Sequence, residues 1–391
     1  MELIFDYLQT QLKELRILNV AREDTISIKK MASKFDGCEK IVVIGTGGSS
    51  LGGKCLVNIA AGLKGKSPRV IFLENVDSLT FLNSIQRLDQ NKTGIIVISK
   101  SGKTTESLML FLTLLELWPN FDYKSRAMAI TELSEDNDLR NLADSLDMEI
   151  VEHDKNIGGR FSVFSVVGLL PAFLEGWDID SFRQGGREVL NQLEICHHYK
   201  ESALFLEAIG MFEEFSTGTI DQHVLMIYSD LLEDYGKWFA QLIGESLGKS
   251  ECFGITPVRA IGSIDQHSLL QLFLAGPKNK LYTVLGIERE SNSDRIPRIE
   301  RGHNSPSGQN RVIERLENKT IYEIMNMHRR STIAALKECG VVREILLDGL
   351  DEPSLGEVMM REIIVVITLA RRADINPFDQ PAVEGLKQKL S

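Results

Sequence analysis

The chain has 391 residues, of which 43% are hydrophobic and 25% are charged, and its formal net charge is -11. This length predicts about two or three domains with a sizeable core, and the composition is typical of a soluble globular protein. The acidic balance argues against nucleic acid as the main partner. A small phosphate compound stays open as a ligand, because local rather than net charge decides such binding.

The cysteines and the N-terminal residues bear on the cellular setting. No apolar run reaches the length that spans a membrane, and residues 1–22 mix charged and apolar side chains, unlike a signal peptide. The cysteine count is odd and no C-x-x-C occurs, which predicts reduced thiols in the cytoplasm rather than disulfides or a zinc site. The cysteines are Cys38, Cys55, Cys196, Cys252 and Cys339.

A glycine-rich turn follows the first predicted strand. Residues 3–18 have the spacing of an amphipathic helix, and the β-rich run Ile41–Ile44 then opens into G-T-G-G-S-S-L-G-G-K at Gly45–Lys54. The glycine spacing differs from the dinucleotide-binding fingerprint. Closely spaced glycines let a backbone approach a ligand, and the alternative is tight packing of a helix on a strand. We favour ligand approach, because the turn lies at the carboxyl end of a strand.

A second turn, S-K-S-G-K-T-T at Ser99–Thr105, follows the buried run Ile95–Ser99 and precedes the apolar helical segment Leu108–Leu115. A strand that leads into a helix through such a turn directs free backbone N–H groups at one point, where the helix dipole favours an anion. The four hydroxyl and two ammonium groups of this turn exceed what an ordinary N-cap needs. The turn therefore predicts a phosphate site, although the Walker pattern is absent.

Strands alternate with helices in the first half, which predicts a parallel, doubly wound sheet. The expected strands are Ile41–Ile44, Val70–Leu73, Ile95–Ser99, Ala127–Thr131 and Met148–Val151. Such sheets bind ligands beyond the carboxyl ends of their strands, at a topological switch point. Both turns lie at such ends, so we expect them to face one crevice.

An arginine opens the apolar segment Phe161–Phe173. It is Arg160, within N-I-G-G-R-F-S at Asn156–Ser162. A charged side chain at the start of an apolar helix needs a partner. One interpretation is a salt bridge, and the other is an arginine directed into the crevice at an anionic oxygen.

The second half is also strand-rich and α/β, without a residue-level repeat, so a duplicated fold is one interpretation. A charged helical region at Asp178–Ser216 leads into it. The polar stretch Glu288–Val312 predicts a long surface loop. The expected strands are Val224–Tyr228 and Tyr282–Ile287, and the expected later helices are Ile321–Cys339 and Glu357–Ala373.

Several polar residues of the second half are candidates for chemistry. Gln241 and Glu245 are four residues apart and share a helix face, where Glu245 is either an exposed carboxylate or a buried base. His267 opens an apolar helix, a position that is more often structural than catalytic. Two prolines predict a turn into a last helix, and its Lys387 is either functional or a solvated residue near the terminus.

Six motifs, in order over most of the chain, resemble those of the glucose-6-phosphate isomerase (phosphoglucose isomerase) family. They are G-T-G-G-S at Gly45–Ser49, S-K-S-G-K-T-T-E-S at Ser99–Ser107, G-G-R-F-S at Gly158–Ser162, Q-L-I-G-E-S-L-G-K at Gln241–Lys249, D-Q-H-S at Asp265–Ser268 and F-D-Q-P-A-V-E-G-L-K at Phe378–Lys387. The resemblance implies two sugar-isomerase (SIS) domains, each a three-layer α/β/α unit with a doubly wound, mainly parallel sheet. They would span residues 1–175, with the phosphate loop, and 176–391, with a C-terminal helix that returns to the active site.

The resemblance also implies a role for each matching residue. Glu245 would be the base that moves a proton between C1 and C2, and Arg160 would stabilise the enediolate oxygen. His267 and Lys387 would transfer protons during ring opening. The family's histidine comes from the neighbouring subunit, so a homodimer with His267 supplied across the interface is implied, with neither metal nor cofactor. The contacts to phosphate and sugar would be Ser99, Lys100, Ser101, Thr104, Ser49, Gly48, Gly158, Gln241 and Gln380.

The implied reaction interconverts glucose 6-phosphate and fructose 6-phosphate in glycolysis and gluconeogenesis, through a cis-enediolate. The residue types fit this chemistry independently, because removing a proton next to a carbonyl needs a carboxylate near a cation. No motif for a redox cofactor is present. One alternative is an isomerase that also accepts mannose 6-phosphate. The other is a non-catalytic sugar-phosphate sensor, which would keep the phosphate loop but need not keep all four catalytic side chains.

Some residues depart from the family's motifs, but none of these changes removes a proposed catalytic side chain. In the phosphate loop Lys103 stands where Thr is usual, and it either adds positive charge there or points to solvent. The other departures are Leu247 for Asn, Asp265 for Gly, Ala382 for Gly, and the reversed order of Gly385 and Leu386.

Overall fold

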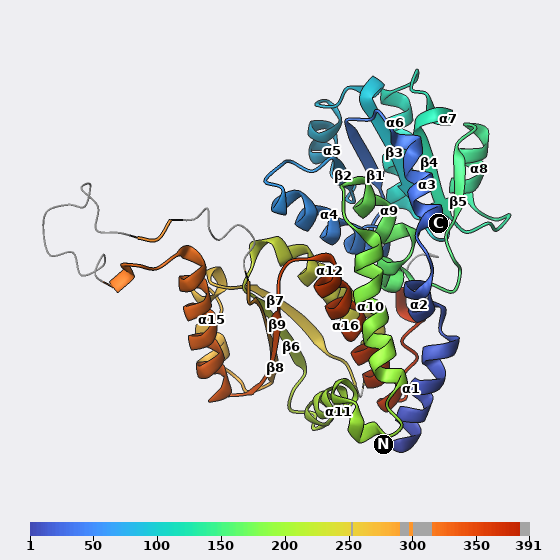
Figure 1. Ribbon diagram of the computed structural model, residues 1–391. Helices are drawn as coiled ribbons and strands as arrows, with labels where there is room; N and C mark the ends of the chain where they lie inside the picture. Colours follow the sequence, from blue (N-terminus) through green and yellow to red (C-terminus); the bar gives the residue numbers. More distant parts are fainter. Residues whose placement is uncertain (252, 290–296, 300–314, 384–391) are drawn as a thin grey trace, which may run out of the picture.

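The computed structural model describes residues 1–251, 253–289, 297–299 and 315–383 (Figure 1). Its first sheet has the strand order β2-β1-β3-β4-β5, and all neighbouring strands are parallel. All five strands overlap the predicted ones, because a short apolar run forms the centre of each. Their bounds are β1 Lys40–Ile44, β2 Val70–Leu73, β3 Thr93–Ile98, β4 Ala127–Thr131 and β5 Glu149–Glu152.

Helices cover both faces of this sheet. Along β1, Val42 and Ile44 belong to one apolar cluster and Ile41 and Val43 to another, since successive side chains of a strand point to opposite faces. The helices on the first face are α5 Ser78–Ile85, α6 Thr105–Leu117 and α8 Asp138–Ser145, and those on the second are α4 Leu51–Leu63 and α9 Val166–Leu174. The first half is therefore a three-layer α/β/α unit.

The second sheet is also parallel, with the order β7-β6-β8-β9. Its strands are β6 Gln222–Ile227, β7 Thr256–Ile261, β8 Lys280–Ile287 and β9 Val341–Leu347. Strands β6 and β8 overlap the two predicted strands, whereas β7 and β9 have no counterpart among them. Both are edge strands. Pro257 lies in β7, a position tolerated only at an edge, and Arg343 and Glu344 interrupt the apolar run of β9.

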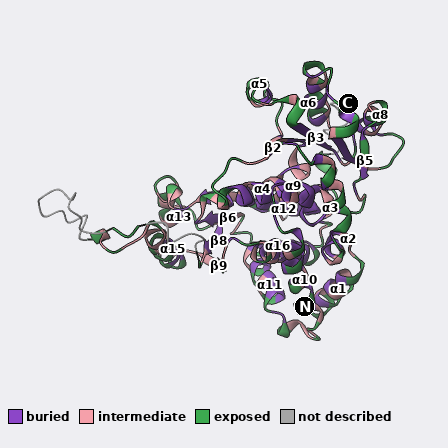
Figure 2. Cartoon of the chain, turned by 45° about the horizontal axis from the view of Figure 1, so that its top comes forward, coloured by how far each residue is buried: buried purple, intermediate pink, exposed green. Residues whose placement is uncertain are grey.

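Helices cover this second sheet on both sides, which confirms the predicted fold class. On one face lie α11 Ala203–Ser216, α12 Glu233–Leu247 and α16 Glu352–Arg372, with α10 Ile179–Glu194 packed on α16. On the other face lie α13 Leu270–Ala275 and α15 Ile321–Lys337. Figure 2 shows that α12 and α16 are largely buried at the centre of the molecule.

The N-terminal helix is interrupted. The predicted helix over residues 3–18 is two helices, α1 Glu2–Glu14 and α2 Arg16–Asn19, because Leu15 between them has extended backbone. Helix α1 packs against α10 and α16, and the ring of its Phe5 meets that of Phe205 on α11 edge-on, with centroids 5.1 Å apart. The N-terminal helix thus packs on helices of the second half. The domain division after residue 175 stays a prediction.

Some predicted features fall outside the described residues. Most of the stretch Glu288–Val312 does so, and so does Lys387, although residues 381–383 are already helical. The four described cysteines, Cys38, Cys55, Cys196 and Cys339, are free thiols. Within the described part of the chain, no helix combines the length and the apolar character needed to cross a membrane.

Candidate active site

The two predicted turns meet at the carboxyl edge of the first sheet. Strand β1 lies between β2 and β3, so the chain leaves it toward one neighbour and returns beside the other, which is a switch point. A Cβ atom placed on Gly45 would lie 3.1 Å from the carbonyl oxygen of Ile98 at the end of β3. The glycine-rich turn therefore lies directly against the start of the hydroxyl-rich turn, as expected for one shared crevice.

The hydroxyl-rich turn is held by its own side chains and by one glycine. The buried Ser99 hydroxyl lies 2.9 Å from the hydroxyl of Thr104, which precedes the first residue of α6. Gly102 has a φ of +69°, and a side chain there would collide with Asn137, the N-cap of α8. This left-handed conformation bends the backbone sharply between β3 and α6.

The two lysines of this turn point to other acceptors. The Lys100 ammonium donates to the carbonyl oxygen of Lys155 at 2.7 Å and lies 3.7 Å from the Glu132 carboxylate. Lys103 forms an exposed ion pair of 2.5 Å with Asp136. Lys103 thus points away from the turn toward a surface partner, in line with the second of its two interpretations.

The glycine-rich turn contacts the segment that carries Arg160. A Cβ atom on Gly48 would collide with the backbone of Gly159, and the Ser162 hydroxyl donates to the Gly48 carbonyl oxygen at 3.0 Å. Gly48 is therefore needed for backbone-to-backbone packing. Gly48 and Ser49 lie in the short 3-10 helix Gly47–Ser49, and Gly158 is the residue just before the 3-10 helix Gly159–Phe164.

Arg160 is buried and makes polar contacts to both halves of the molecule. Its side chain is 0% exposed, and its Nη1 donates to Glu245 Oε2 at 2.9 Å. Its Nε donates to the Ser246 hydroxyl at 2.8 Å, and its Nη2 donates to the carbonyl oxygens of Pro377 and, at 3.0 Å, Asp379. Burial lowers the pKa of Arg160, and the Glu245 carboxylate opposes that effect. Arg160 thus forms a salt bridge, and its partner is the candidate base, while a role of Arg160 at an anionic oxygen stays a prediction.

Glu245 projects from the last turns of α12 with both oxygens engaged. Gln241, one turn earlier, donates from Nε2 to Glu245 Oε1 at 2.9 Å, while Arg160 holds Oε2. The Glu245 side chain remains 29% exposed, so it is half-buried rather than buried. The Oε1 atom of Gln241 is buried and has no hydrogen-bond partner among the described residues.

Helix α12 also reaches the glycine-rich turn of the first half. A Cβ atom on Gly47 would lie 3.2 Å from Gln241 Nε2. A cavity of about 390 Å³ opens next to Glu245. Its walls are Gly244, Glu245, Gly248, Lys249, Ser250, Glu251, Gln380, Pro381, Ala382 and Val383. Gln380 thus lies at the same cavity as Glu245.

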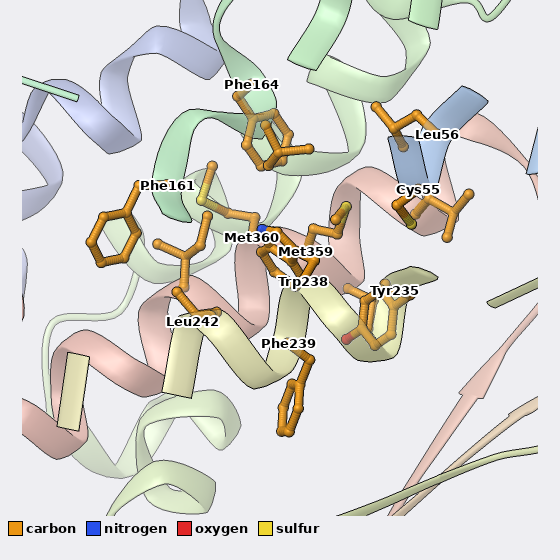
Figure 3. Packing of buried hydrophobic residues seen from close by; sticks show 14 of the residues in the cluster. Cys55, Leu56, Phe161, Phe164, Tyr235, Trp238, Phe239, Leu242, Met359 and Met360 are labelled. Atoms are coloured by element: carbon orange, nitrogen blue, oxygen red, sulfur yellow. The ribbon is translucent and has the colours of Figure 1, made fainter. Parts of the chain in front are cut away.

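Buried apolar side chains from several elements surround the place where the segment of Arg160 meets α12 (Figure 3). Trp238 on α12 packs among them, and its indole Nε1 donates to the Arg160 carbonyl oxygen at 3.2 Å. Figure 3 also places Phe161 and Phe164 on the segment of Arg160 close to Met360 of α16. This close packing fixes the backbone from which Arg160 extends.

Lys249, Ser246 and Asp379 are contacts that the sequence analysis assigned no role. Lys249 donates to the carbonyl oxygen of Asn376 at 2.5 Å, and to the carbonyl oxygen and carboxylate of Asp379 at 2.6 Å each. Lys249, Ser246 and Asp379 lie in the quoted motifs, whereas Asn376 does not. The spacing of a motif does not reveal that a side chain forms a hydrogen bond with a distant backbone carbonyl group. Burial lowers the pKa of Lys249, and the Asp379 carboxylate opposes that effect.

The other two predicted catalytic residues are His267 and Lys387. Lys387 lies outside the described residues. His267 is exposed, and its imidazole forms no hydrogen bond with any described residue. It follows β7 near the carboxyl edge of the second sheet, where the neighbouring Gln266 donates to the Tyr228 hydroxyl at 2.8 Å.

The length of α12 separates His267 from Glu245. This helix runs back from the carboxyl end of β6 to the amino end of the parallel strand β7. Glu245 is near the far end of the helix, about 18 Å from its first residue at a rise of 1.5 Å per residue. Within one chain, the structure therefore does not bring His267 to Glu245. Among the described residues, no cluster of three His, Cys, Asp or Glu side chains suits a metal ion.

Two parallel α/β/α units with a site at their junction define an α/β protein of the sugar-isomerase (SIS) fold. In agreement, a solved Escherichia coli tagatose-6-phosphate ketose/aldose isomerase superposes with a TM-score of 0.55 at 13% identity, covering 96% of this chain and 95% of that one. The model of the family described as phosphoglucose isomerase matches residues 18–265. The chain belongs to the phosphoglucose isomerase family, and it is an isomerase.

Individual relatives agree with this assignment over nearly the whole chain. A protein of Haloarcula marismortui named as probable glucose-6-phosphate isomerase is 31% identical, over 92% of this chain and 79% of its own length. A glucose-6-phosphate isomerase of Thermus thermophilus is 32% identical, over 93% of this chain and 86% of its own length. A crystal structure from the same species, solved as a hypothetical protein, has a TM-score of 0.87 at 27% identity, covering 99% and 93% of the two chains.

Proposed function

We propose that this isomerase interconverts glucose 6-phosphate and fructose 6-phosphate by moving a proton between C1 and C2. The observation that carries the proposal is the contact between Arg160 and Glu245. A fully buried guanidinium lies 2.9 Å from a half-exposed carboxylate, which borders a cavity of about 390 Å³. The family and the names of the relatives support the choice of substrate.

In this mechanism, Glu245 removes the proton from C2 of the open-chain aldose. The electron pair of the C–H bond forms the C1=C2 bond of a cis-enediolate, and negative charge collects on the oxygens. Arg160 stabilises that charge, because a cation fixed in a buried site needs little reorganisation as the charge develops. Glu245 then returns the proton to C1 while the hydroxyl proton passes from O2 to O1, so that the carbonyl has moved to C2. Gln241 and Arg160 orient the carboxylate through one oxygen each.

We assign the phosphate to the turn of Ser99, Lys100, Ser101 and Thr104, at the start of α6. Two hydroxyls lie 2.9 Å apart there, and the helix N-terminus favours an anion. Lys100 would leave the Lys155 carbonyl oxygen, 2.7 Å away, to reach the ligand. The residues proposed to line the sugar are Gly48, Ser49, Gly158, Gln241 and Gln380.

We further propose that ring opening uses His267 and Lys387, with His267 supplied by the second subunit of a homodimer. The separation of His267 from Glu245 along α12 supports this, because within one chain the two side chains lie near opposite ends of that helix. We expect the enzyme to act in the cytoplasm, in glycolysis and gluconeogenesis. The free thiols of the described cysteines are consistent with a reducing compartment.

A coupled assay tests the proposal. Fructose 6-phosphate is given to the purified protein, and glucose 6-phosphate is read with a dehydrogenase, without added metal. We expect turnover that Glu245→Gln lowers on the order of 10⁴-fold, since the amide cannot accept the proton. Glu39→Gln is the matched control, because this exposed glutamate pairs with Lys92 at the amino edge of the first sheet.

The outcomes separate the alternatives. Full turnover in Glu245→Gln would remove Glu245 from the role of base. Absence of turnover in the wild type, with fructose 6-phosphate still raising the melting temperature, would indicate a sugar-phosphate sensor. A parallel arm with mannose 6-phosphate measures the breadth of the substrate range.

A further inference from the structure

The segment Asn376–Asp379 is held by two cations that come from different halves of the molecule. Lys249, two residues past the end of α12, donates to the Asn376 carbonyl oxygen and to both the carbonyl and carboxylate oxygens of Asp379, over 2.5–2.6 Å. Arg160, from the first half, donates to the carbonyl oxygens of Pro377 and Asp379. The Asp379 carbonyl oxygen therefore accepts from both cations at once.

Lys249 lines the cavity beside Glu245, yet its position argues against contact with a substrate. An ammonium group has three N–H donors, and Lys249 has three acceptors within 2.6 Å. Its side chain is only 10% exposed. With each donor matched to an oxygen of the protein, no donor is left for a ligand.

The segment that Lys249 holds is itself a closed turn. Asn376 donates from Nδ2 to the Asp379 carboxylate at 2.8 Å, and accepts from the Phe378 backbone N–H at 3.1 Å. The ring of Phe378 packs near Phe161, next to Arg160, with centroids 5.8 Å apart. The turn thus reaches Arg160 through two carbonyl oxygens and one aromatic ring, and Gln380 follows directly.

We propose that Lys249 is a positioning residue, which clamps the turn Asn376–Asp379 against Arg160 so that Arg160 Nη1 stays aimed at Glu245. The clamp fixes Nη2 through two carbonyl oxygens, and the planar guanidinium transmits that orientation to Nη1. Gln380 is carried to the cavity by the same turn. This inference rests on the proposed function of Arg160 and Glu245, and it adds a residue that acts through them.

The clamp predicts that Lys249→Met lowers kcat rather than raising KM. Misplacing Arg160 weakens the stabilisation of the enediolate, on the order of 10²-fold in kcat for a displacement of about 1 Å. KM for fructose 6-phosphate should change by less than about threefold, because the turn assigned to the phosphate is not altered. Lys249→Arg should not restore kcat, since a planar fork cannot reproduce three bonds from one nitrogen.

Asp379→Asn is a milder second variant, which tests the proposed clamp if Lys249→Met does not fold. It removes one charged acceptor and keeps both carbonyl oxygens, so kcat should fall only about three- to tenfold. In the double variant, the two effects should not multiply, because both act on one contact. Lys92→Met is the matched control, since its ion pair with Glu39 has the same 2.6 Å length as that of Lys249 with Asp379.

Hydrogen exchange provides a readout that does not depend on activity. The backbone amides of residues 376–383, except those of the two prolines in this range, should exchange faster in Lys249→Met and Asp379→Asn than in the wild type, and Lys92→Met should leave them unchanged. Wild-type kcat with unchanged exchange in these variants would overturn the clamp. A rise in KM with kcat retained would overturn it as well, because it would make Lys249 a substrate contact. If the wild type has no turnover, the proposed reaction fails, and exchange alone then tests the clamp.

Discussion

The two sheets have the same parallel construction but contribute to the site in different ways. The first sheet offers its carboxyl edge, where the turns after β1 and β3 lie against each other. The second offers the end of α12, with Gln241 and Glu245, beside the amino end of β7. Its own carboxyl edge carries His267, which does not reach the site of the same chain.

This difference shows how a repeated fold supplies unlike parts of one site. A carboxyl edge presents backbone N–H groups and helix N-termini, which suit an anion. By contrast, Glu245 lies near the C-terminal end of α12, where no N-terminal helix dipole stabilises the charge of its carboxylate. In the proposed function, the first half binds the phosphate and the second half transfers the proton, and Arg160 of the first half contacts the Glu245 carboxylate of the second.

Breaking the connection between the halves should have the largest effect. Arg160→Lys keeps the charge but cannot reach Glu245, Ser246 and the carbonyl oxygens of the turn together. We expect kcat to fall on the order of 10³-fold, since stabilisation of the oxyanion is lost. Steady-state kinetics with fructose 6-phosphate measure this, and a fall of less than about threefold would exclude Arg160 from that role.

Mixing two inactive variants tests how the carboxyl edge of the second sheet is used. His267→Ala alone should lower kcat on the order of 10²-fold, because a proton donor for ring opening is lost. When His267→Ala and Glu245→Gln chains are co-expressed, random pairing in a twofold dimer should restore about a quarter of the wild-type activity. No recovery in a verified mixed dimer would mean that His267 serves its own chain or none.

The close approach of the first sheet's turn is tested by Gly48→Ala. Its methyl group would press on the Gly159 backbone, next to Arg160. We expect kcat to fall about tenfold and stability by about 1–3 kcal/mol, as for other overpacked sites. Gly37→Ala is a poor control because its φ is positive, whereas Gly210, with open space around it, suits the purpose. Equal behaviour of Gly48→Ala and Gly210→Ala would show that the close approach is not required.

The smallest expected effect is on the pH dependence of stability, to which one buried histidine in each half contributes. Burial lowers the pKa of His153, after β5, to about 4 and that of His223, in β6, to about 3. Between pH 6.5 and the lowered pKa, the unfolded chain takes up a proton that the folded chain resists, so stability falls as the pH falls. Above pH 6.5, both states are neutral and this dependence ends.

His153→Gln should remove its share of that dependence. Between pH 7 and pH 5, we expect the loss of unfolding free energy to be smaller by about 2 kcal/mol than in the wild type. Urea titrations of the variant and of the wild type at the two pH values measure these losses. The contribution of the carboxylates cancels when the loss in the variant is subtracted from the loss in the wild type. An unchanged pH dependence would show that His153 does not resist protonation.

The sequence predicts the first sheet better than the second for a physical reason. Strands such as β3 are buried on both faces and appear as apolar runs. The missed strands β7 and β9 lie at edges, where Pro257 and Arg343 are accommodated. The break at Leu15 and the packing of α1 on α16 depend on tertiary contacts, which no local pattern encodes.

For the candidate site, the motifs identify the side chains but not their partners. Glu245 and Arg160 are conspicuous in the sequence, and the structure adds that they contact each other. Lys249 donates hydrogen bonds to backbone carbonyl oxygens, and because every residue has such an oxygen, the sequence does not show which one is the acceptor. The distance of His267 from Glu245 follows only from the direction and length of α12.

One consequence of the shared core concerns folding. A single apolar cluster includes Ile41 and Val43 of β1 together with Leu225 and Ile227 of β6, joined through α4, α12 and α16. Cutting the chain between its halves would leave a broad apolar surface on each fragment, with nothing to cover it. We therefore expect that neither half folds alone, and that heating melts the two sheets in one cooperative transition.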